Sequence, residues 1–261
     1  MPVTDAPAKA RALYDARRTR VPIPPFTDDD PTLGMADGYA IQRELIDLLL
    51  ADGDRIVGHK VGLTSKPMQK MVGVDSPDYG PVLASTVYRD GDTIPASRFI
   101  APKIEAEIVF VIGERLEGPG VTVTRAHAAI AGAVAAMEIV DSRIADWRIK
   151  LADTVADLAS NGAMATSSRI VPIADIDPRL VGMTLTRNGE LIDTGAGAAA
   201  LGDPVAVVAW LANVLGGDGV ALEPGHLIMT GALHAAVPMT PGDVFRAEFD
   251  RLGPITVRVG E

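Results

Sequence analysis

The sequence predicts an α+β fold in which a strand-rich body follows an N-terminal helical arm. Helical periodicity dominates residues 1–54, whereas short β-branched runs alternate with turn-forming residues from residue 55 onward. Helices and strands segregated in this way are typical of α+β proteins rather than of doubly wound sheets. We therefore expect an arm over residues 1–54 and a body over residues 55–261 that together form one functional unit.

The arm is expected to contain two helices separated by a proline-rich stretch. Residues 8–19 are rich in Ala, Arg and Leu. Residues 36–53 place Ile41 and Leu45 at helical spacing, and Gly53 stands where the helix should end. The arm therefore precedes the body as a helical segment.

The first part of the body is expected to alternate strands with turns. β-Branched residues predict strands over residues 55–63, 86–95 and 103–113. A short helix is expected over residues 65–73, with a serine as its cap. Residues 74–82 are dense in Asp, Pro and Gly and are expected to form a loop.

The second part of the body continues this pattern. A helix over residues 124–134 is expected to lead into an apolar strand over residues 135–144. An Asn-Gly pair within residues 185–195 predicts a hairpin. A last helix is expected to start at Asp203, with a proline in its first turn, and to end near Gly216.

Composition and charge exclude several classes of site and partner. The chain holds no cysteine, which excludes disulfides, thiolate nucleophiles and zinc–thiolate sites and leaves oxygen or imidazole as metal ligands. Its net charge of −10 disfavours nucleic acid and anionic membranes as partners. A small anionic substrate remains compatible, because a bound metal reverses the field inside a cleft.

The sequence also predicts a cytoplasmic location. The N-terminal residues lack the apolar core of a signal peptide. The longest apolar stretches, such as residues 205–212, are far shorter than a bilayer span.

Three carboxylates interrupt apolar strand sequences. Strand alternation puts Glu105 and Glu107 on one face of residues 103–113, and Glu138 interrupts the apolar run AAMEIV. Solvated Glu-x-Glu faces are common, but the apolar residues on both strand faces favour a buried site here. Neighbouring carboxylates in such a setting need a cation to stay ionised. Oxygen ligands alone favour Mg²⁺ or Mn²⁺.

Other ionisable residues have two interpretations each. Lys60 lies inside the strand expected over residues 55–63, where it either extends to solvent at a sheet rim or faces a pocket as a cation. Asp78, in SPDYG, either forms a simple turn or lines that pocket. The histidines show no ligand spacing and are interpreted as structural or surface residues; they are His59, His127, His226 and His234.

One segment imitates a nucleotide-binding motif. Residues 195–202, GAGAAALG, fit a loose dinucleotide fingerprint, which is a weak signal by itself. The residues before it are typical of a hairpin, and the helix after it begins too late to hold a phosphate. No nicotinamide cofactor is expected.

The longer motifs together resemble one family. GHKVGLTSKPMQKMVGVDSPDYG, PKIEAEIVFVI, MEIVDSRIADWRIKLADTVAD and GAGAAALGDPVAVVAWLAN occur in this order. They resemble the 2-hydroxypenta-2,4-dienoate (2-oxopent-4-enoate) hydratases, which belong with the 4-oxalocrotonate decarboxylases to the fumarylacetoacetate hydrolase-like superfamily. The resemblance runs from about Tyr39 to the C-terminus. It implies a mixed β-roll or sandwich fold and a role in the degradation of aromatic compounds.

The resemblance also implies roles for individual residues. Glu105, Glu107 and Glu138 would hold Mg²⁺ or Mn²⁺, and Lys60 and Asp78 would be catalytic. The substrate would touch Leu63, Ser160, Thr230 and Gly231. One departure is Leu158, because hydratases of this family usually carry Asn at that position, and loss of the amide removes a donor and an acceptor.

The resemblance favours hydration of a small 2-hydroxydienoic or 2-oxo acid. Decarboxylation of 4-oxalocrotonate is the nearest alternative, followed by hydrolysis of a carbon–carbon bond in an acylpyruvate and by a non-catalytic partner subunit. The hydrolase would need a histidine near the metal to activate water. The candidates are His59 and His127, which precede Glu138 in the sequence. The family further implies a homo-oligomer and a complex with a decarboxylase or aldolase of the same pathway.

Overall fold

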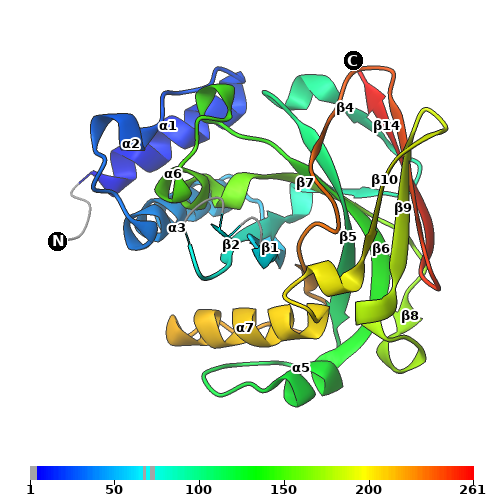
Figure 1. The fold of residues 1–261 in the computed structure, drawn as a ribbon. Helices are drawn as coiled ribbons and strands as arrows, with labels where there is room; N and C mark the ends of the chain where they lie inside the picture. Colours follow the sequence, from blue (N-terminus) through cyan, green and yellow to red (C-terminus); the bar gives the residue numbers. More distant parts are fainter. Residues whose placement is uncertain (1–4, 67–68, 71–73) are drawn as a thin grey trace.

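The computed structural model describes residues 5–66, 69–70 and 74–261, which adopt the α+β arrangement expected from the sequence (Figure 1). The α-helices are α1 (Ala6–Thr19), α2 (Phe26–Asp29), α3 (Met35–Ala51), α5 (Val123–Ala129), α6 (Leu151–Ala156) and α7 (Pro204–Gly217). The strands are β1 (Ile56–Gly62), β2 (Asp78–Leu83), β3 (Val87–Arg89), β4 (Thr93–Pro95), β5 (Lys103–Ile112), β6 (Ile130–Val140), β7 (Asn161–Thr166), β8 (Val171–Pro172), β9 (Gly182–Arg187), β10 (Glu190–Ala196), β11 (Leu227–Met229), β12 (Val237–Pro238), β13 (Val244–Phe249) and β14 (Gly253–Gly260).

Local sequence signals account for most of these boundaries. The hairpin expected at Asn188 is formed by β9 and β10. Helix α7 starts as expected, because the Asp203 carboxylate accepts a hydrogen bond of 2.9 Å from the Val205 amide and Pro204 occupies the first turn. In α3 the Asp37 carboxylate accepts from the Gly34 amide at 2.9 Å.

Three expectations about the body need correction. The loop expected over residues 74–82 is wrong from Asp78 onward, since those residues form β2. The helix expected over residues 124–134 ends at Ala129, and β6 begins five residues before the expected strand. Helix α6 was not expected. The helix expected over residues 65–73 falls partly outside the described residues; Lys66, Gln69 and Lys70 are helical.

Among the described residues the strands form two sheets. The first has nine strands in the order β2-β1-β11-β5-β6-β7-β3, with β12 added beside β5 and β8 beside β6. The second has five strands in the order β10-β9-β13-β14-β4. Parallel pairs such as β1 with β11 occur beside antiparallel pairs such as β5 with β6, so the first sheet is mixed.

The main core lies between the two sheets and under α7. Ile104, Ile108 and Phe110 of β5 point into it, together with Phe245 of β13 and Leu211 of α7. One stretch of the described chain, residues 197–217, has the length and mean hydropathy (1.6) of a membrane span, and half of it is buried. It contains α7, whose apolar side chains belong to this core.

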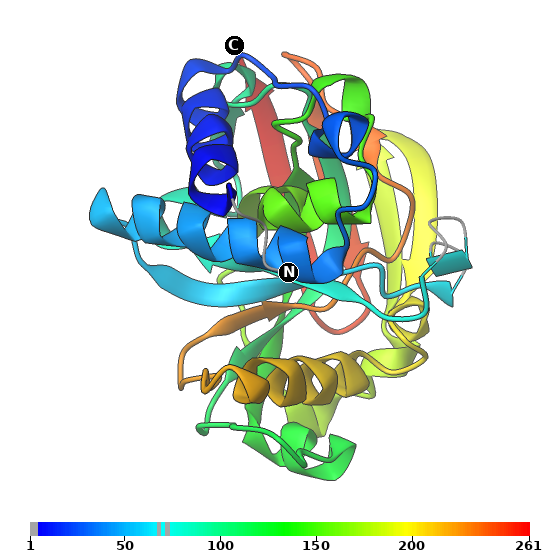
Figure 2. The same cartoon turned by 90° about the vertical axis from the view of Figure 1, so that its left-hand side faces the viewer.

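The N-terminal helices pack beside β2, at one end of the first sheet. Figures 1 and 2 show α1, α2 and α3 gathered with α6 on one side of the molecule. Leu13 of α1 and Ile41 and Leu45 of α3 form an apolar cluster with Leu83 of β2 and Leu158. The helices and the first sheet are therefore joined by a continuous apolar contact.

Candidate functional site

Three carboxylates meet on one face of the nine-stranded sheet. Glu105, Glu107 and Glu138 each offer one oxygen, and these oxygens all lie within 4.8 Å of one another. Glu107 and Glu138 are almost completely buried, at 1% and 0% exposure. The structure therefore brings together the acids that the strand pattern singled out.

Strand pairing explains why the acids meet. Glu105 and Glu107 share a face of β5 because side chains alternate along a strand. Glu138 lies directly opposite Glu105 in the antiparallel pair of β5 with β6, and the small Ala136 lies opposite Glu107. The next pair on this face, Val109 and Val134, continues into an apolar cluster. The carboxylates thus stand at the end of an apolar sheet face.

The contacts of the acids leave one buried oxygen without a partner. The Gly231 amide donates a hydrogen bond of 3.0 Å to Oε2 of Glu107. The Asn161 side-chain amide lies 3.4 Å from Oε1 of Glu138. Among the described residues, Oε2 of Glu138 has no hydrogen-bond partner although it is buried. A buried carboxylate oxygen left in this way is suited to a cation.

Burial and mutual repulsion keep these acids from ionising easily. Burial, followed by the neighbouring Glu138, raises the pKa of Glu105 to about 7. Burial, Glu138 and Glu105 raise the pKa of Glu107 well above its usual range. Burial also raises the pKa of Glu138, against the opposing effect of Lys60. A divalent cation would relieve this cost, since it stabilises all three carboxylates at once.

Lys60 belongs to the same group and does not extend to solvent. Its ammonium lies 3.4 Å from Oε1 of Glu138 and donates a hydrogen bond of 2.9 Å to the Ala159 carbonyl. Burial alone would lower its pKa, but Glu138, Asp78 and Glu105 outweigh burial and raise it. Lys60 is therefore a buried cation beside the carboxylates.

Asp78 lies on the same face as Lys60, in β2 and not in a simple turn. Asp78 pairs with Gly62 and Lys60 pairs with Gly80 in the ladder between β1 and β2. Asp78 is buried, and its Oδ1 has no hydrogen-bond partner among the residues described. Burial raises the pKa of Asp78, although Lys60 opposes the shift. A buried carboxyl group with a raised pKa is a candidate for proton transfer.

Gly62 and Gly80 leave space on this sheet face beside Asp78, Lys60 and the Leu158 carbonyl. A Cβ on Gly62 would lie 2.3 Å from Oδ1 of Asp78 and 3.3 Å from the Lys60 ammonium. A Cβ on Gly80 would lie 2.2 Å from the Leu158 carbonyl oxygen. Glycine is needed at both positions because any side chain would fill the space that these groups share.

A left-handed turn supplies the carbonyl that binds Lys60. Leu158, Ala159 and Ser160 have φ values of 56°, 52° and 56°. Left-handed backbone costs roughly 1–2 kcal/mol per non-glycine residue, so the surrounding structure must hold the turn. The Leu158 side chain belongs to the apolar cluster under the N-terminal helices, and it is 1% exposed. Leucine at this position therefore packs against the arm.

A buried ion pair holds that turn in place. The Arg143 Nε donates to Oδ1 of Asp157 at 2.5 Å, and its other nitrogens donate to the carbonyls of Asp157 and Asn161. The Asp157 carbonyl also accepts from the Ser160 amide at 2.9 Å. Arg143, Asp157 and Asn161 were not predicted as site residues from the sequence. The sequence signal for these residues is their position, because they are charged or amide residues that flank the short helix α6.

The remaining expected site residues lie along two loops and a strand end. Ser160 is buried, and its hydroxyl lies 3.0 Å from that of Thr154. The Thr230 hydroxyl donates to the Ile108 carbonyl at 2.9 Å. Gly231 has a φ of 104°, and a Cβ there would lie 1.9 Å from the Thr64 hydroxyl. Leu63 adopts a φ of 55° just beyond β1.

Tyr39 is a further residue of this region that the sequence analysis did not assign. Its hydroxyl accepts a hydrogen bond of 3.2 Å from the Tyr79 amide, and the two rings stack at 4.5 Å. Burial and the neighbouring Asp78 raise the pKa of Tyr39. Since Tyr39 lies in α3, the N-terminal helices contribute to the surroundings of Asp78.

The histidines have other surroundings. His59 follows the alternation of β1 to the face opposite Lys60, and its ring meets that of His226 edge-on at 6.0 Å. Nε2 of His234 accepts a hydrogen bond of 2.7 Å from the Ala106 amide. His127 lies on the short helix α5. These positions agree with structural roles.

Comparison with known proteins places this geometry in a family. Residues 55–260 match the model of the fumarylacetoacetate (FAA) hydrolase C-terminal family. The structure is similar to that of 4-oxalocrotonate decarboxylase from Pseudomonas putida G7 complexed with magnesium and adipate. The TM-score is 0.95, the sequence identity is 36%, and the match covers 98% of this chain and 97% of the other.

Curated relatives are similar over nearly the whole chain. A 2-keto-4-pentenoate hydratase of Paraburkholderia xenovorans (strain LB400) is 43% identical over 94% of this chain and 91% of its own. A 2-hydroxyhexa-2,4-dienoate hydratase of Comamonas testosteroni is 38% identical over 97% of both chains. The expected fold type is thereby confirmed, and the chain belongs to the fumarylacetoacetate hydrolase C-terminal family.

Proposed function

We propose that this protein is a divalent-metal-dependent hydratase that converts 2-hydroxypenta-2,4-dienoate into 4-hydroxy-2-oxopentanoate. The observation that carries this proposal is the group of Glu105, Glu107 and Glu138, of which the last two are fully buried, with Lys60 and Asp78 on the same sheet face. The 43% identity to a 2-keto-4-pentenoate hydratase supports the choice of substrate.

Glu105, Glu107 and Glu138 are the proposed ligands of Mg²⁺ or Mn²⁺. Their three oxygens and the unpartnered Oε2 of Glu138 fit a hard cation that prefers oxygen ligands. When bound, the cation would supply positive charge for the carboxylate and the 2-oxygen of the substrate.

Asp78 is the proposed group that moves protons. Conversion of the dienol to the unsaturated 2-oxo acid takes a proton from the 2-hydroxyl and adds one at C5. Water then adds across C3 and C4, with its oxygen on C4 and a proton on C3. A buried carboxyl group with a raised pKa and a free Oδ1 can accept and return such protons.

Lys60 is the proposed cation that faces the anionic end of the substrate. Its ammonium is fixed by the Ala159 carbonyl and Glu138, so it is oriented before substrate binds. Leu63, Ser160, Thr230 and Gly231 are the proposed substrate contacts.

Decarboxylation of 4-oxalocrotonate is the second candidate, because the similar magnesium-bound decarboxylase structure has a TM-score of 0.95. A carbon–carbon hydrolase is less well supported, since His59 lies on the opposite sheet face from Lys60 and His127 lies on α5.

The test offers both substrates to the same protein. Purified protein with Mg²⁺ is mixed with freshly generated 2-hydroxypentadienoate and, separately, with 4-oxalocrotonate. Loss of dienol absorbance, release of CO₂ and the mass of the product are followed. Formation of 4-hydroxy-2-oxopentanoate without CO₂ supports the hydratase. Faster CO₂ release from 4-oxalocrotonate would identify a decarboxylase, and an absence of turnover of both would refute the proposal.

The proposal extends to the wider setting of the protein. The substrate is a small anion, and we propose a homo-oligomeric protein of the cytoplasm that associates with a decarboxylase or aldolase of the same pathway. We also propose that residues 1–54 and residues 55–261 act as one unit, because Tyr39 of α3 lies beside Asp78.

A further inference from the structure

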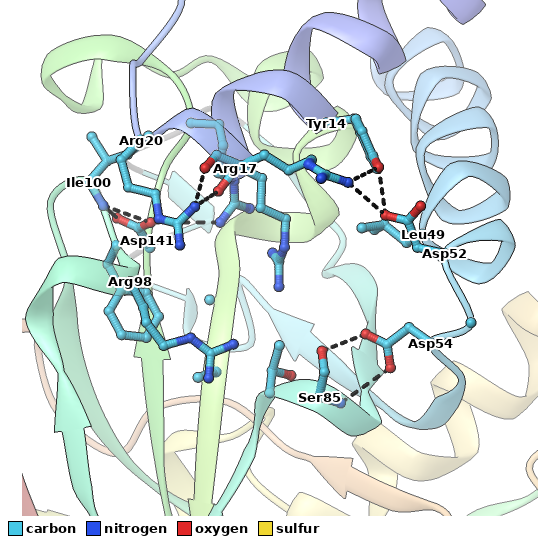
Figure 3. Close-up of a pocket in the computed structure, with 17 residues that line it drawn as sticks. Tyr14, Arg17, Arg20, Leu49, Asp52, Asp54, Ser85, Arg98, Ile100 and Asp141 are labelled. Atoms are coloured by element: carbon cyan, nitrogen blue, oxygen red, sulfur yellow. Dashed lines mark hydrogen bonds and ion pairs between the residues drawn. The ribbon is translucent and has the colours of Figure 1, made fainter.

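A cavity lies between the N-terminal helices and the body. Its volume is about 410 Å³, and its wall includes Arg17 of α1, Asp52 at the end of α3, and Arg98, Asp141 and Arg143 of the body. Figure 3 shows Arg17 and Arg98 entering it from opposite sides. None of its lining residues is one of the three clustered glutamates, so it is separate from the proposed active site.

The acids in the wall of this cavity already have donors. Asp141 accepts from the amides of Ile100 and Ala101. Asp54 accepts from the hydroxyl and the amide of Ser85. The Asp52 carboxylate is bound by the Tyr14 hydroxyl at 2.5 Å (Figure 3). These carboxylates are thus engaged with local partners.

Two of the arginines in the wall, Arg17 and Arg98, have few hydrogen-bond acceptors. Arg143 is fully engaged by Asp157 and the Asn161 carbonyl, and Arg20 donates to backbone carbonyls of α1. Arg98 donates to the Tyr88 hydroxyl. In the part of the chain that the structure describes, the Arg17 guanidinium has no acceptor within hydrogen-bond distance. A guanidinium carries five N–H donors, so Arg17 and Arg98 retain most of theirs.

The charges of the residues that line the cavity also favour an anion. Five arginines line the cavity against three aspartates. Burial, followed by the positive charge of Arg143, lowers the pKa of Arg17 to about 10, against the opposing effects of Asp157 and Asp141. Like charges that face one cavity are stabilised by a shared counter-ion.

We propose that this cavity binds a small multivalent oxyanion, a phosphate or a dicarboxylate, that holds α1 against the body. Arg17 comes from the helical arm and Arg98 from the segment before β5, so one anion bound by both would bridge the two parts. Planar guanidinium groups bind such oxyanions through paired hydrogen bonds. The volume suits a small molecule rather than a polypeptide segment.

The test uses inorganic phosphate on the full chain in the presence of a chelator, so that phosphate cannot act through a metal at the glutamates. Isothermal titration is compared for wild type, Arg17→Gln and Arg98→Gln, with Arg125→Gln as the control. Arg125 is an exposed arginine of α5 that pairs with Glu114, remote from the cavity. We expect each cavity variant to bind phosphate about 10-fold or more weakly and the control to match wild type.

A second measurement reports the bridging itself. Hydrogen exchange of residues 6–19 should slow in phosphate, compared with chloride of equal ionic strength, in wild type but not in Arg17→Gln. Equal phosphate binding by wild type and both cavity variants would show an adventitious ion only and refute the site. The proposal also fails if phosphate does not bind and both variants lower the oligomer mass in light scattering. In that case an acidic group of a second copy occupies the cavity.

Discussion

The Lys60 ammonium lies 3.4 Å from Oε1 of Glu138, and both side chains are buried. Oε2 of the same carboxylate has no partner among the described residues. Glu138 thus has one oxygen beside a fixed ammonium and one that lacks a partner. One lysine cannot neutralise three carboxylates and Asp78, so the site as a whole still requires positive charge.

Replacement of Lys60 by methionine should separate catalysis from metal binding. We expect kcat to fall about 100-fold or more, because the fixed cation is lost. Mg²⁺ affinity should be kept, since all three carboxylates remain and a competing cation is gone. Steady-state kinetics and titration with Mg²⁺ measure the two effects. Lys103→Met is the matched control, because Lys103 lies on β5 and packs over the Trp147 ring at 4.2 Å. Wild-type kcat in Lys60→Met would show that Lys60 is structural.

Glu107→Gln should remove metal-dependent activity while the fold is retained. The glutamine oxygen can still accept the Gly231 amide that Glu107 accepts at 3.0 Å, so local structure should persist. Loss of a residue that hydrogen-bonds a metal ligand lowers metal affinity roughly 10–100-fold. Loss of a ligand itself should therefore lower Mg²⁺ affinity by more than this. Calorimetry with Mg²⁺ and circular dichroism test these points. Glu114→Gln, an exposed substitution of the same chemistry, should change neither. Full turnover of Glu107→Gln in chelator would refute the assigned metal site.

The stability of the metal-free protein should fall as pH rises. Burial raises the pKa of Glu105 to about 7, and the pKa of Glu107 is raised as well, so the folded state holds protons that the unfolded state has released. The contribution of Glu105 is complete below about pH 4.5 and is lost as pH rises through about 7, and the raised pKa of Glu107 acts in the same direction. Denaturant unfolding in chelator at pH 5 to 8 measures this loss, and Mg²⁺ should reverse it most at pH 8. A stability that rises with pH in chelator would contradict the burial of these carboxylates.

The sequence predicted the parts of the fold that local signals specify. The Asn188 turn, the Asp203 cap and the alternation of β5 were each readable because nearby residues determine them. β2 was missed because Asp78, Gly80 and their neighbouring prolines favour turns, whereas pairing with β1 makes them a strand. Tertiary pairing there overrides local preference.

The candidate site was likewise predictable only where local sequence signals determine it. Glu105 and Glu107 share a face by strand periodicity alone, but their meeting with Glu138 depends on the register between β5 and β6. The turn at Leu158–Ser160 has no glycine or asparagine that would signal a left-handed backbone. The carbonyl that binds Lys60 could therefore not be found from the sequence.

Gly62→Ala tests whether the space between Asp78 and Lys60 is used in catalysis. The added methyl group would lie 2.3 Å from Oδ1 of Asp78 and 3.3 Å from the Lys60 ammonium, so the carboxyl group must move. Because proton transfer depends on placement within about 1 Å, we expect kcat to fall about 100-fold. Gly182→Ala is the control, since a Cβ there meets no described atom within 4 Å. Kinetics and thermal unfolding of both variants are compared. Loss of kcat in Gly62→Ala with stability close to that of Gly182→Ala supports a catalytic Asp78. Unchanged kcat would mean that Asp78 can shift without consequence and takes no part in the reaction.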